Sequence, residues 1–359
     1  MAGYGIVSGV ALKETASAQV FENFIQNVLH VNGKGVDESY VNQAALNSQS
    51  IAIPRVLLGA GGFRTLGATV NGGQFNSEDA VVPQSNYFYV PLLYVYDRTE
   101  TLAKIMNDKA GYELLSKVTE NIGKKIARGI NAISFAEQFA VTLNASAGGT
   151  PTYITESEGV SAYDAFVDAN ALLDEGDEEI ECDYFPTEMR QAFVRPSFFS
   201  EFKKGDGTRY VTQSNLGQEM LATGVLNPFT NSEASKVQMR DGYAGDIDGV
   251  PVYKVSPILW KLAAQYTMKD GSALTATAFD NIDAVICSAV GTIRGFSSNG
   301  DIEVVPATRG QGWILQPLVH GGVKCVSAKS VRLIVKSGFT NPATAALKLS
   351  VLPVESQSA

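Results

Sequence analysis

The spacing of apolar residues changes along the chain from a period of two to a period of 3.6. Between Gly111 and Phe139 the apolar residues recur three or four positions apart, while the charged ones fall off this line. The stripe is Leu115, Val118, Ile122, Ile126, Ile130 and Ile133, and the charged set is Lys117, Glu120, Lys124, Lys125 and Arg128. One apolar stripe of this length predicts a single amphipathic helix, roughly 40 Å long at ~1.5 Å per residue. The stretch that follows, "LNASAGGTPT", has the composition of a linker.

Before this helix the pattern is that of strands. We expect a long hairpin with one strand at Phe63–Val70, a turn at Asn71–Gly73, and a second strand in the aromatic, β-branched segment Asn86–Asp97. Pro91 has no N–H to donate, which places its strand at a sheet edge. Because a two-stranded hairpin is not stable alone, it is expected to pack on another subunit. Residues 1–58 are weakly periodic and predict an extended arm whose apolar residues are buried against a neighbour.

After the helix, short helices and strands follow one another in an order typical of an α+β unit. A capping-box pattern at Ser161 and Asp164 predicts a helix. The segment "RQAFVRP" predicts a short strand, and Pro196 is predicted to lie in the first turn of another helix. A further helix is expected at 258–266. The end of the chain is rich in strands, at "DAVICSAV", "DIEVVPA", "GWILQPLVHGGVKC" and "SVRLIVKS", and the residues after Gly338 are predicted to form a tail.

Composition narrows the classes of protein. The chain has 359 residues, 45% hydrophobic and 18% charged, which indicates a folded protein of two or three compact units. Its formal net charge of −9 excludes a reader of nucleic-acid grooves. There is no signal-peptide pattern and no apolar run of membrane-spanning length, so we expect a soluble protein made in a cytoplasm. Cys182, Cys287 and Cys325 form no C-x-x-C motif and are expected to be small buried residues.

Candidate chemistry is sparse. The glycines at 59, 61, 62 and 67 lack the spacing of a phosphate loop, and His30 and His320 lie in unrelated segments. The acidic run Asp174–Asp183 lacks the ligand order of a calcium loop and is expected to be a solvated helix end. We therefore expect no catalytic, metal-binding or cofactor-binding residue.

The segment "RDGYAGDIDGVPVYKVS" also lacks a cation-binding pattern, since Asp241, Asp246 and Asp248 do not have the required spacing. Asp248-Gly249 is instead a strong hairpin signal between two strand-like runs. Gly245, Asp248 and Gly249 are therefore predicted to be structural turn residues. An alternative is a hydrolase that uses Asp246 and Asp248, although no nucleophile motif accompanies them.

In the order of its parts, and in several local patterns, the chain resembles the major capsid proteins of tailed bacteriophages, which have the Hong Kong 97-type fold. "YDAFVDANALLDE" with "MRQAFVRPSFFSEFKK", then "YAGDIDGVPVYKVSPI", and finally "DAVICSAVGTI", "DIEVVPA" and "GWILQPLVHGGVKCVSAKSVRLI" carry the resemblance, over roughly residues 60–338. It implies an N-terminal arm, an E-loop hairpin, a P-domain with its spine helix, an A-domain, returning P-domain strands, and a final A-domain strand with a C-terminal tail. The corresponding ranges are 1–58, 59–98, 99–160, 161–300, 301–328 and 329–359.

The function that this resemblance implies is assembly. Copies of the chain would form hexamers and pentamers that tile an icosahedral or prolate head shell around double-stranded DNA, in the virion, after assembly in the host bacterial cytoplasm. The implied partners are other copies, a separate scaffolding protein, a portal, decoration proteins and non-specific contact with packaged DNA. An alternative is an encapsulin-like nanocompartment shell, which shares the fold.

Two features depart from some members of the family. Some are cross-linked through a lysine on the E-loop, but residues 63–98 contain no lysine, so no such cross-link is expected. Others begin with a large scaffolding segment that is cut off. Here the hairpin lies close to Met1, so we expect no large N-terminal cleavage.

Overall fold

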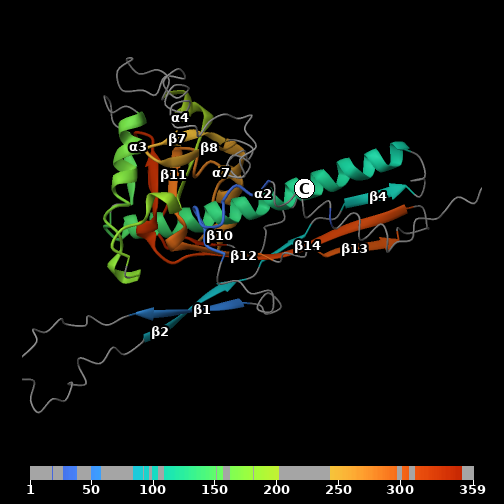
Figure 1. The fold of residues 1–359 in the computed structure, drawn as a ribbon, viewed down its shortest axis with the longest axis horizontal. Helices are drawn as coiled ribbons and strands as arrows, with labels where there is room; N and C mark the ends of the chain where they lie inside the picture. The colour runs from blue at the N-terminus through green and yellow to red at the C-terminus, as the bar shows by residue number, and fades with distance from the viewer. Residues whose placement is uncertain are drawn as a thin grey trace, which may run out of the picture.

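The computed structural model describes a core of the chain and several strands that extend from it. The described residues are 18, 27–38, 50–57, 84–91, 93–96, 99–103, 109–150, 152–156, 162–180, 182–201, 243–296, 301–306 and 312–349. They form an α+β fold, as the sequence predicts. One long helix runs out of a compact unit built on a mixed sheet, and a second sheet lies along that helix (Figure 1). No helix among these residues combines the length and apolar character needed to cross a bilayer.

The compact unit is built on a six-stranded sheet with two covered faces. Its order is β5 (Tyr153–Thr155), β15 (Val331–Val335), β11 (Ile282–Ser288), β6 (Arg190–Val194), β8 (Val250–Lys254) and β7 (Tyr243–Ile247). The β15–β5 and β6–β8 pairs are parallel, and the others are antiparallel. Side chains alternate along β11, so that Val285 and Cys287 face one core cluster while Ala284 and Ile286 face the other.

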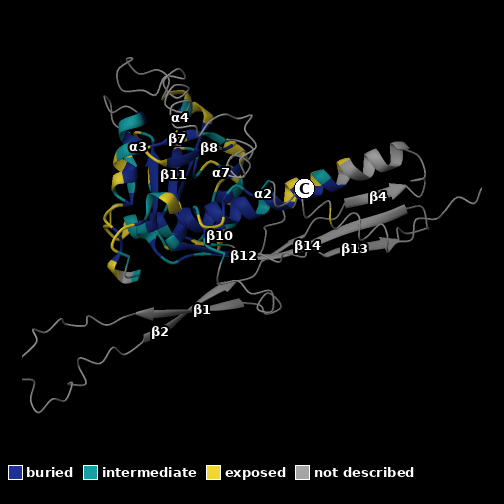
Figure 2. Ribbon diagram, in the orientation of Figure 1, coloured by how far each residue is buried: buried dark blue, intermediate teal, exposed yellow. Residues whose placement is uncertain are grey.

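Helices cover both faces of this sheet. On one face lie α7 (Pro257–Tyr266) and the second half of α2 (Lys109–Ala147). On the other lie α3 (Ala162–Ala171) and α4 (Pro196–Glu201). The central strands of the sheet and the helix residues packed against them are buried (Figure 2). The short strand β6 and the helix that begins at Pro196 are where the sequence predicts them. For the helix the reason is local, since a proline favours the first helical position.

Helix α2 has 39 residues and is amphipathic only in its first half. Ile122, Ile126 and Ile130 of the predicted stripe are buried, whereas every residue from 131 to 140 is buried, whichever face it occupies. A helix enclosed on all sides must have partners for its polar side chains. Glu137 accepts hydrogen bonds from Lys324 Nζ (2.9 Å) and the Cys325 backbone N–H (3.3 Å), which fixes the end of one long strand to this helix.

The helix continues beyond its predicted end at Phe139 to Ala147, so the first half of the predicted linker "LNASAGGTPT" is helical. The reason is tertiary. The Asn144 amide donates to the Leu347 carbonyl (2.8 Å) and accepts from the Leu347 N–H (2.9 Å). Gly149, with φ +97°, follows the helix end, and a positive φ of this kind favours glycine.

The residues after Gly338, which the sequence predicts to form a tail, are packed against the body of the protein as far as Leu349. Residues 339–349 lie along the end of α2, with Ala343 and Leu347 buried. Strand β16 (Lys348–Leu349) pairs with β9 (Thr267–Lys269), which also pairs with β10 (Ser272–Ala273). Residues 350–359 of the predicted tail lie outside the described residues.

A second sheet lies along the outward half of α2. Its long strand β14 (Gly312–Cys325) pairs with β12 (Thr292–Phe296) and β13 (Asp301–Pro306). Two short strands, β3 (Leu93–Tyr96) and β4 (Thr99–Ala103), also pair with β14. Figure 1 shows α2 and this sheet extending together from the compact unit.

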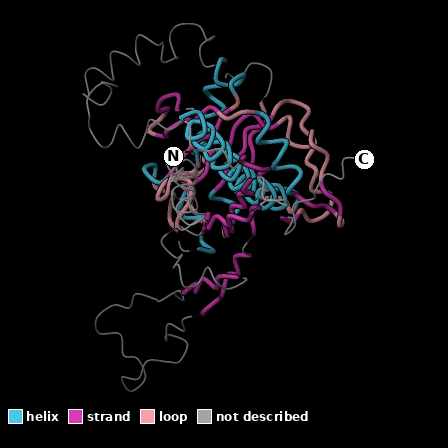
Figure 3. The backbone as a smooth tube through the Cα atoms, turned by 90° about the vertical axis from the view of Figure 1, so that its right-hand side faces the viewer, coloured by secondary structure: helices cyan, strands magenta, loops and turns pink. Residues whose placement is uncertain are grey.

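The predicted aromatic strand Asn86–Asp97 is divided in two. Strand β2 (Gln84–Pro91) ends at the proline, and β3 begins at Leu93 in the other sheet, because Pro91 cannot donate to a continuing ladder. Strand β2 pairs antiparallel with β1 (Ser50–Leu57), a segment assigned to the arm by the sequence. This hairpin projects from the body in both views (Figures 1 and 3). The predicted strand Phe63–Val70 and turn Asn71–Gly73 lie outside the described residues.

Residues 27–38 correct the expectation that the apolar residues of the arm are buried on a neighbour. Val28, Val31 and Val36 are buried within their own chain. The side-chain amides of Asn131 and Gln191 hold this segment. Asn131 accepts from Leu29 N (3.0 Å) and donates to Asn27 O (3.1 Å), while Gln191 accepts from Val31 N (3.0 Å) and donates to Leu29 O (2.9 Å).

His30 lies at the centre of this segment and is fully buried. Its ring contacts those of Phe135 and Phe193, and its Nε2 lies 3.3 Å from Gln138 Oε1. Burial, together with the positive charge of Arg294, lowers the pKa of His30 to about 3. The ring is therefore neutral at pH 7, in a structural role.

The neutral state of the buried His30 ring can be tested by replacing the residue and measuring how the free energy of unfolding depends on pH. Because the folded-state pKa lies below the unfolded value of 6.5, His30 supports stability above pH 6.5 and loses that contribution as the pH falls towards 3. Relative to His30→Leu, the wild-type subunit should lose unfolding free energy as the pH falls from 6.5 to 5, with a slope that rises towards about 1.4 kcal/mol per pH unit. Urea unfolding of unassembled subunits measures this difference, and a difference that does not vary with pH would contradict the assignment.

Candidate functional site

The hairpin of β7 and β8 contains all three residues predicted to form a structural turn. Asp248 and Gly249 occupy the turn with φ values of +52° and +74°, the signs that a two-residue type I′ hairpin requires at both positions. Gly245, with φ +128°, lies where the register between the strands shifts. A bulge of this kind bends an edge strand and locally disrupts its ladder.

The aspartates of this segment bind separate structural partners. The Tyr243 hydroxyl donates to Asp246 (3.0 Å), and the Asn170 amide donates to Asp248 (2.8 Å). Asp241 lies outside the described residues. Among the residues that the structure describes, no group of three or more His, Cys, Asp or Glu side chains is arranged to hold a metal ion. The Asp248 contact instead ties the turn to α3.

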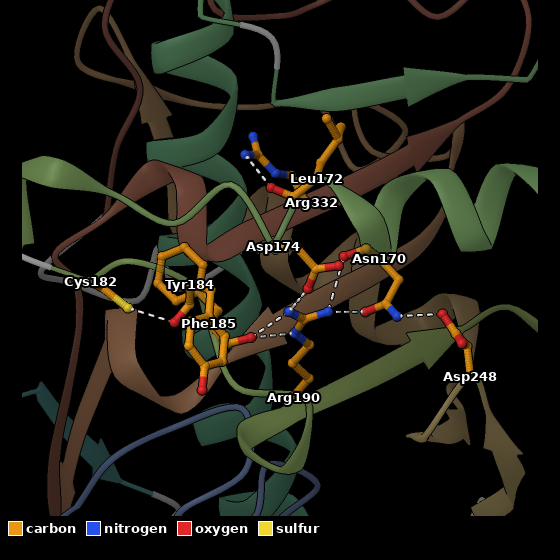
Figure 4. A network of polar contacts seen from close by, with 9 residues as sticks. All are labelled: Asn170, Leu172, Asp174, Cys182, Tyr184, Phe185, Arg190, Asp248 and Arg332. Carbon is orange, nitrogen blue, oxygen red and sulfur yellow. Dashed lines mark hydrogen bonds and ion pairs between the residues drawn. The ribbon is translucent and has the colours of Figure 1, made fainter.

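That contact belongs to a network centred on Arg190, which the sequence reading missed (Figure 4). Arg190 begins the buried strand β6 and is only 1% exposed. Its Nη1 donates to the backbone oxygen (3.0 Å) and side-chain oxygen (2.7 Å) of Asn170, its Nε donates to the Phe185 carbonyl (2.9 Å), and its Nη2 pairs with Asp174. The available signal was an arginine at the start of the predicted strand "RQAFVRP", because a charge buried in a strand needs partners.

Much of the acidic run Asp174–Asp183 is solvated after the end of α3, as the sequence predicts, with Asp174, Glu175, Glu178 and Asp183 exposed. Backbone contacts and one buried carboxylate, which the sequence did not predict, also close the segment between Asp177 and Cys182. The backbones of Asp177 and Cys182 exchange two hydrogen bonds, of 2.7 and 3.0 Å. The carboxylate of Asp177 is buried, accepts from Ser327 and lies 3.7 Å from Lys329 Nζ. At Gly176 (φ +69°) an added Cβ would lie 2.2 Å from the Asp183 carbonyl, so the closure requires glycine.

The cysteines follow the sequence expectation in part. Cys287 and Cys325 are buried, free thiols, and burial raises the pKa of Cys325 to about 11. Cys182 is only half-buried, and its Sγ lies 3.0 Å from the Tyr184 carbonyl.

A second polar cluster lies at the edge of the six-stranded sheet where β5 and β15 end and β11 begins. Asp283 is buried, with Lys336 Nζ at 3.5 Å, while Arg195 lies 3.7 Å from Asp280. Burial, followed by the negative charges of Asp283 and Glu201, raises the pKa of Glu156 to about 7, and burial also raises the pKa of Asp283. These residues come from four separate segments, so their grouping had no local sequence signal.

Comparisons with known proteins give structural matches over most of the chain. No protein-family model matches, and no curated protein matches by sequence. A solved capsid of an empty GTA particle is 12% identical, with 86% of this chain and 98% of that chain covered and a TM-score of 0.47. The mature capsid of bacteriophage PhiM1 is 10% identical, with coverage of 87% and 93% and a TM-score of 0.45. A virus-like particle from Pyrococcus furiosus is 10% identical, with coverage of 89% and 98% and a TM-score of 0.42.

Substitution of Gly249 tests the turn. Gly249→Val places a β-branched residue at φ +74°, where a non-glycine residue costs on the order of 1–3 kcal/mol, and its Cβ would lie 3.1 Å from Thr187 Cγ2. We expect a lower urea midpoint and a lower yield of folded protein. Gly249→Asn is the matched control, since asparagine tolerates this region better. Wild-type stability and yield in Gly249→Val would show that the turn is misplaced.

The raised pKa of Glu156 predicts a separate pH effect. Because its folded-state value of about 7 exceeds 4.5, its stabilising contribution is complete below pH 4.5 and is lost as the pH rises through 7. Glu156→Gln should therefore gain stability relative to the wild type between pH 5 and pH 8. The gain should be below ~1.4 kcal/mol per unit of pKa shift, because Glu156 is partly solvated.

Thermal unfolding at pH 5 and pH 8 measures this difference. Asp283→Asn removes the neighbouring charge and should reduce the pH dependence contributed by Glu156. An equal effect of Glu156→Gln at both pH values would contradict the raised pKa.

Proposed function

We propose that this chain is a major capsid protein that assembles into the head shell of a tailed bacteriophage, around double-stranded DNA. The observation that carries the proposal is the arrangement of the projecting parts. A 39-residue helix, a sheet built along it and a separate two-stranded hairpin all extend from one compact unit. An isolated hairpin is marginally stable in water, so its position favours contact with another copy.

The proposed domains follow this arrangement. The A-domain is the six-stranded sheet with α3, α4 and α7, and the P-domain is the outward half of α2 with the sheet of β14. The E-loop corresponds to the hairpin of β1 and β2. Strand β12 pairs with β14, which supports placing residues 292–296 in the P-domain rather than in the A-domain.

In the proposed shell, each chain contacts mainly other copies of itself, arranged in hexamers and pentamers. The second half of α2 stiffens the junction between the two domains, because it is packed on all sides in the A-domain core. A separate scaffolding protein, a portal and decoration proteins complete the proposed assembly. Turnover of a substrate is not part of the proposal, and Asp246 and Asp248 have structural partners instead.

Sedimentation of the purified protein tests the proposal. We expect a fast-sedimenting species of uniform size, formed from subunits on concentration, with no added cofactor. Nuclease treatment of particles taken from infected cells should leave protected double-stranded DNA. Protected enzyme cargo in place of DNA would indicate a nanocompartment shell, and a monomer at high concentration would contradict assembly.

A further inference from the structure

Positive charge on the described surface gathers on one face of α2. Four cations within twelve residues of the helix are exposed: Lys117, Lys124, Lys125 and Arg128. At 3.6 residues per turn, Lys117, Lys124 and Arg128 lie within about 40° of one another, opposite the buried isoleucine stripe. These three span about 16 Å along the helix axis. We call the four residues Lys117, Lys124, Lys125 and Arg128 the basic face.

Within residues 117–128 the sequence has one acidic residue, Glu120. Glu120 pairs with Lys124, and both side chains are nearly half exposed, at 44% and 47%. Exposed i,i+4 pairs of this kind contribute little to stability and are readily rearranged. The basic face therefore retains a positive excess in a chain whose formal net charge is −9.

The opposite charge is exposed on the compact unit. Seven of the ten residues from Asp174 to Asp183 are acidic. Asp174 and Asp177 are engaged by Arg190 and Lys329, whereas the remaining described acids on this side are exposed. Asp168 on α3, with Glu175, Glu178 and Asp183 in the loop, forms what we call the acidic face.

The two faces cannot meet within one copy. The acidic face follows α3 at one end of the compact unit, while the exposed residues of α2 lie on the half of the helix that extends from its other side (Figures 1 and 2). Complementary patches at two different places on a subunit make a heterologous, head-to-tail contact. Such contacts close into rings when the rotation between neighbours allows it.

We propose that the basic face of α2 docks on the acidic face of a second copy of this chain. The inference deepens the proposed function, on which it rests, by naming one electrostatic contact between neighbouring subunits. Contacts of this kind steer association and fix its register more than they add affinity.

Nucleic-acid phosphate is the competing occupant, and the charges favour it less. The acidic remainder of the chain, whose formal net charge is −9, repels phosphate. The acidic face of a neighbouring copy carries four negative residues, the same number as the positive residues of the basic face. Each subunit supplies one face of each kind.

Charge reversal with rescue tests the contact. Lys117→Glu with Arg128→Glu cancels the positive excess of the basic face, and Glu178→Lys with Asp183→Lys cancels the negative excess of the acidic face. Each double variant should assemble at least tenfold less well than the wild type, measured as the fraction of subunits in fast-sedimenting particles. The fourfold variant keeps the wild-type net charge and should regain assembly, because the exchanged positions on the two faces again carry opposite charges.

Controls separate the contact from folding and from net charge. Lys261→Glu with Lys348→Glu reverses two exposed lysines elsewhere and should assemble like the wild type. Urea midpoints of the unassembled variants should match the wild type, which excludes loss of folding as the cause.

Two results would overturn the inference. One is failure of the fourfold variant to regain assembly although it folds. The other is normal assembly of Lys117→Glu/Arg128→Glu with less nucleic acid in the particles, which would assign the basic face to phosphate. If the wild type itself forms no particles, the proposed function fails, and mixing the two double variants with each other still tests the contact by association.

Discussion

The structure depends on one constraint, the complete burial of α2 between residues 131 and 140. A helix enclosed on every side has no solvent to satisfy its polar side chains, so each needs a partner within the protein. Ser134 donates to the Ile130 carbonyl of the helix itself, while others bind distant segments. Asn131 binds the arm, Glu137 binds the end of β14, and Gln138 lies beside His30 and Thr292. The polar residues of one helix therefore specify where three distant segments are placed.

This constraint connects the compact unit to its extensions. The same helix whose second half is locked in the core continues outward beneath β14, so its direction is fixed by the core packing. The C-terminal segment pairs with Asn144 and holds the last turn, while Arg294 donates to the His30 carbonyl and to Glu38. A rigid, elongated subunit with one stable core suits a role in which surfaces far from that core contact other copies.

Local patterns in the sequence predicted much of this fold. The apolar stripe gave the long helix, Pro196 gave the start of α4, and Asp248-Gly249 marked a two-residue turn where the structure has one. Long-range pairing was not predictable in the same way. The helix passes through "LNASA" because of the distant residue Leu347, and β1 pairs with β2 across an intervening segment of 26 residues, from 58 to 83. The Arg190 and Glu156 clusters join separate segments and left no periodic signal, apart from an arginine at the start of a predicted strand.

The central claim is that this chain is a shell subunit, and electron microscopy of the purified protein tests it most directly. We predict closed particles whose wall repeats one elongated subunit, with the long helix lying in the wall and the β1–β2 hairpin in contact with a neighbouring copy. Discrete monomers at high concentration, or particles in which that hairpin touches no other subunit, would contradict it.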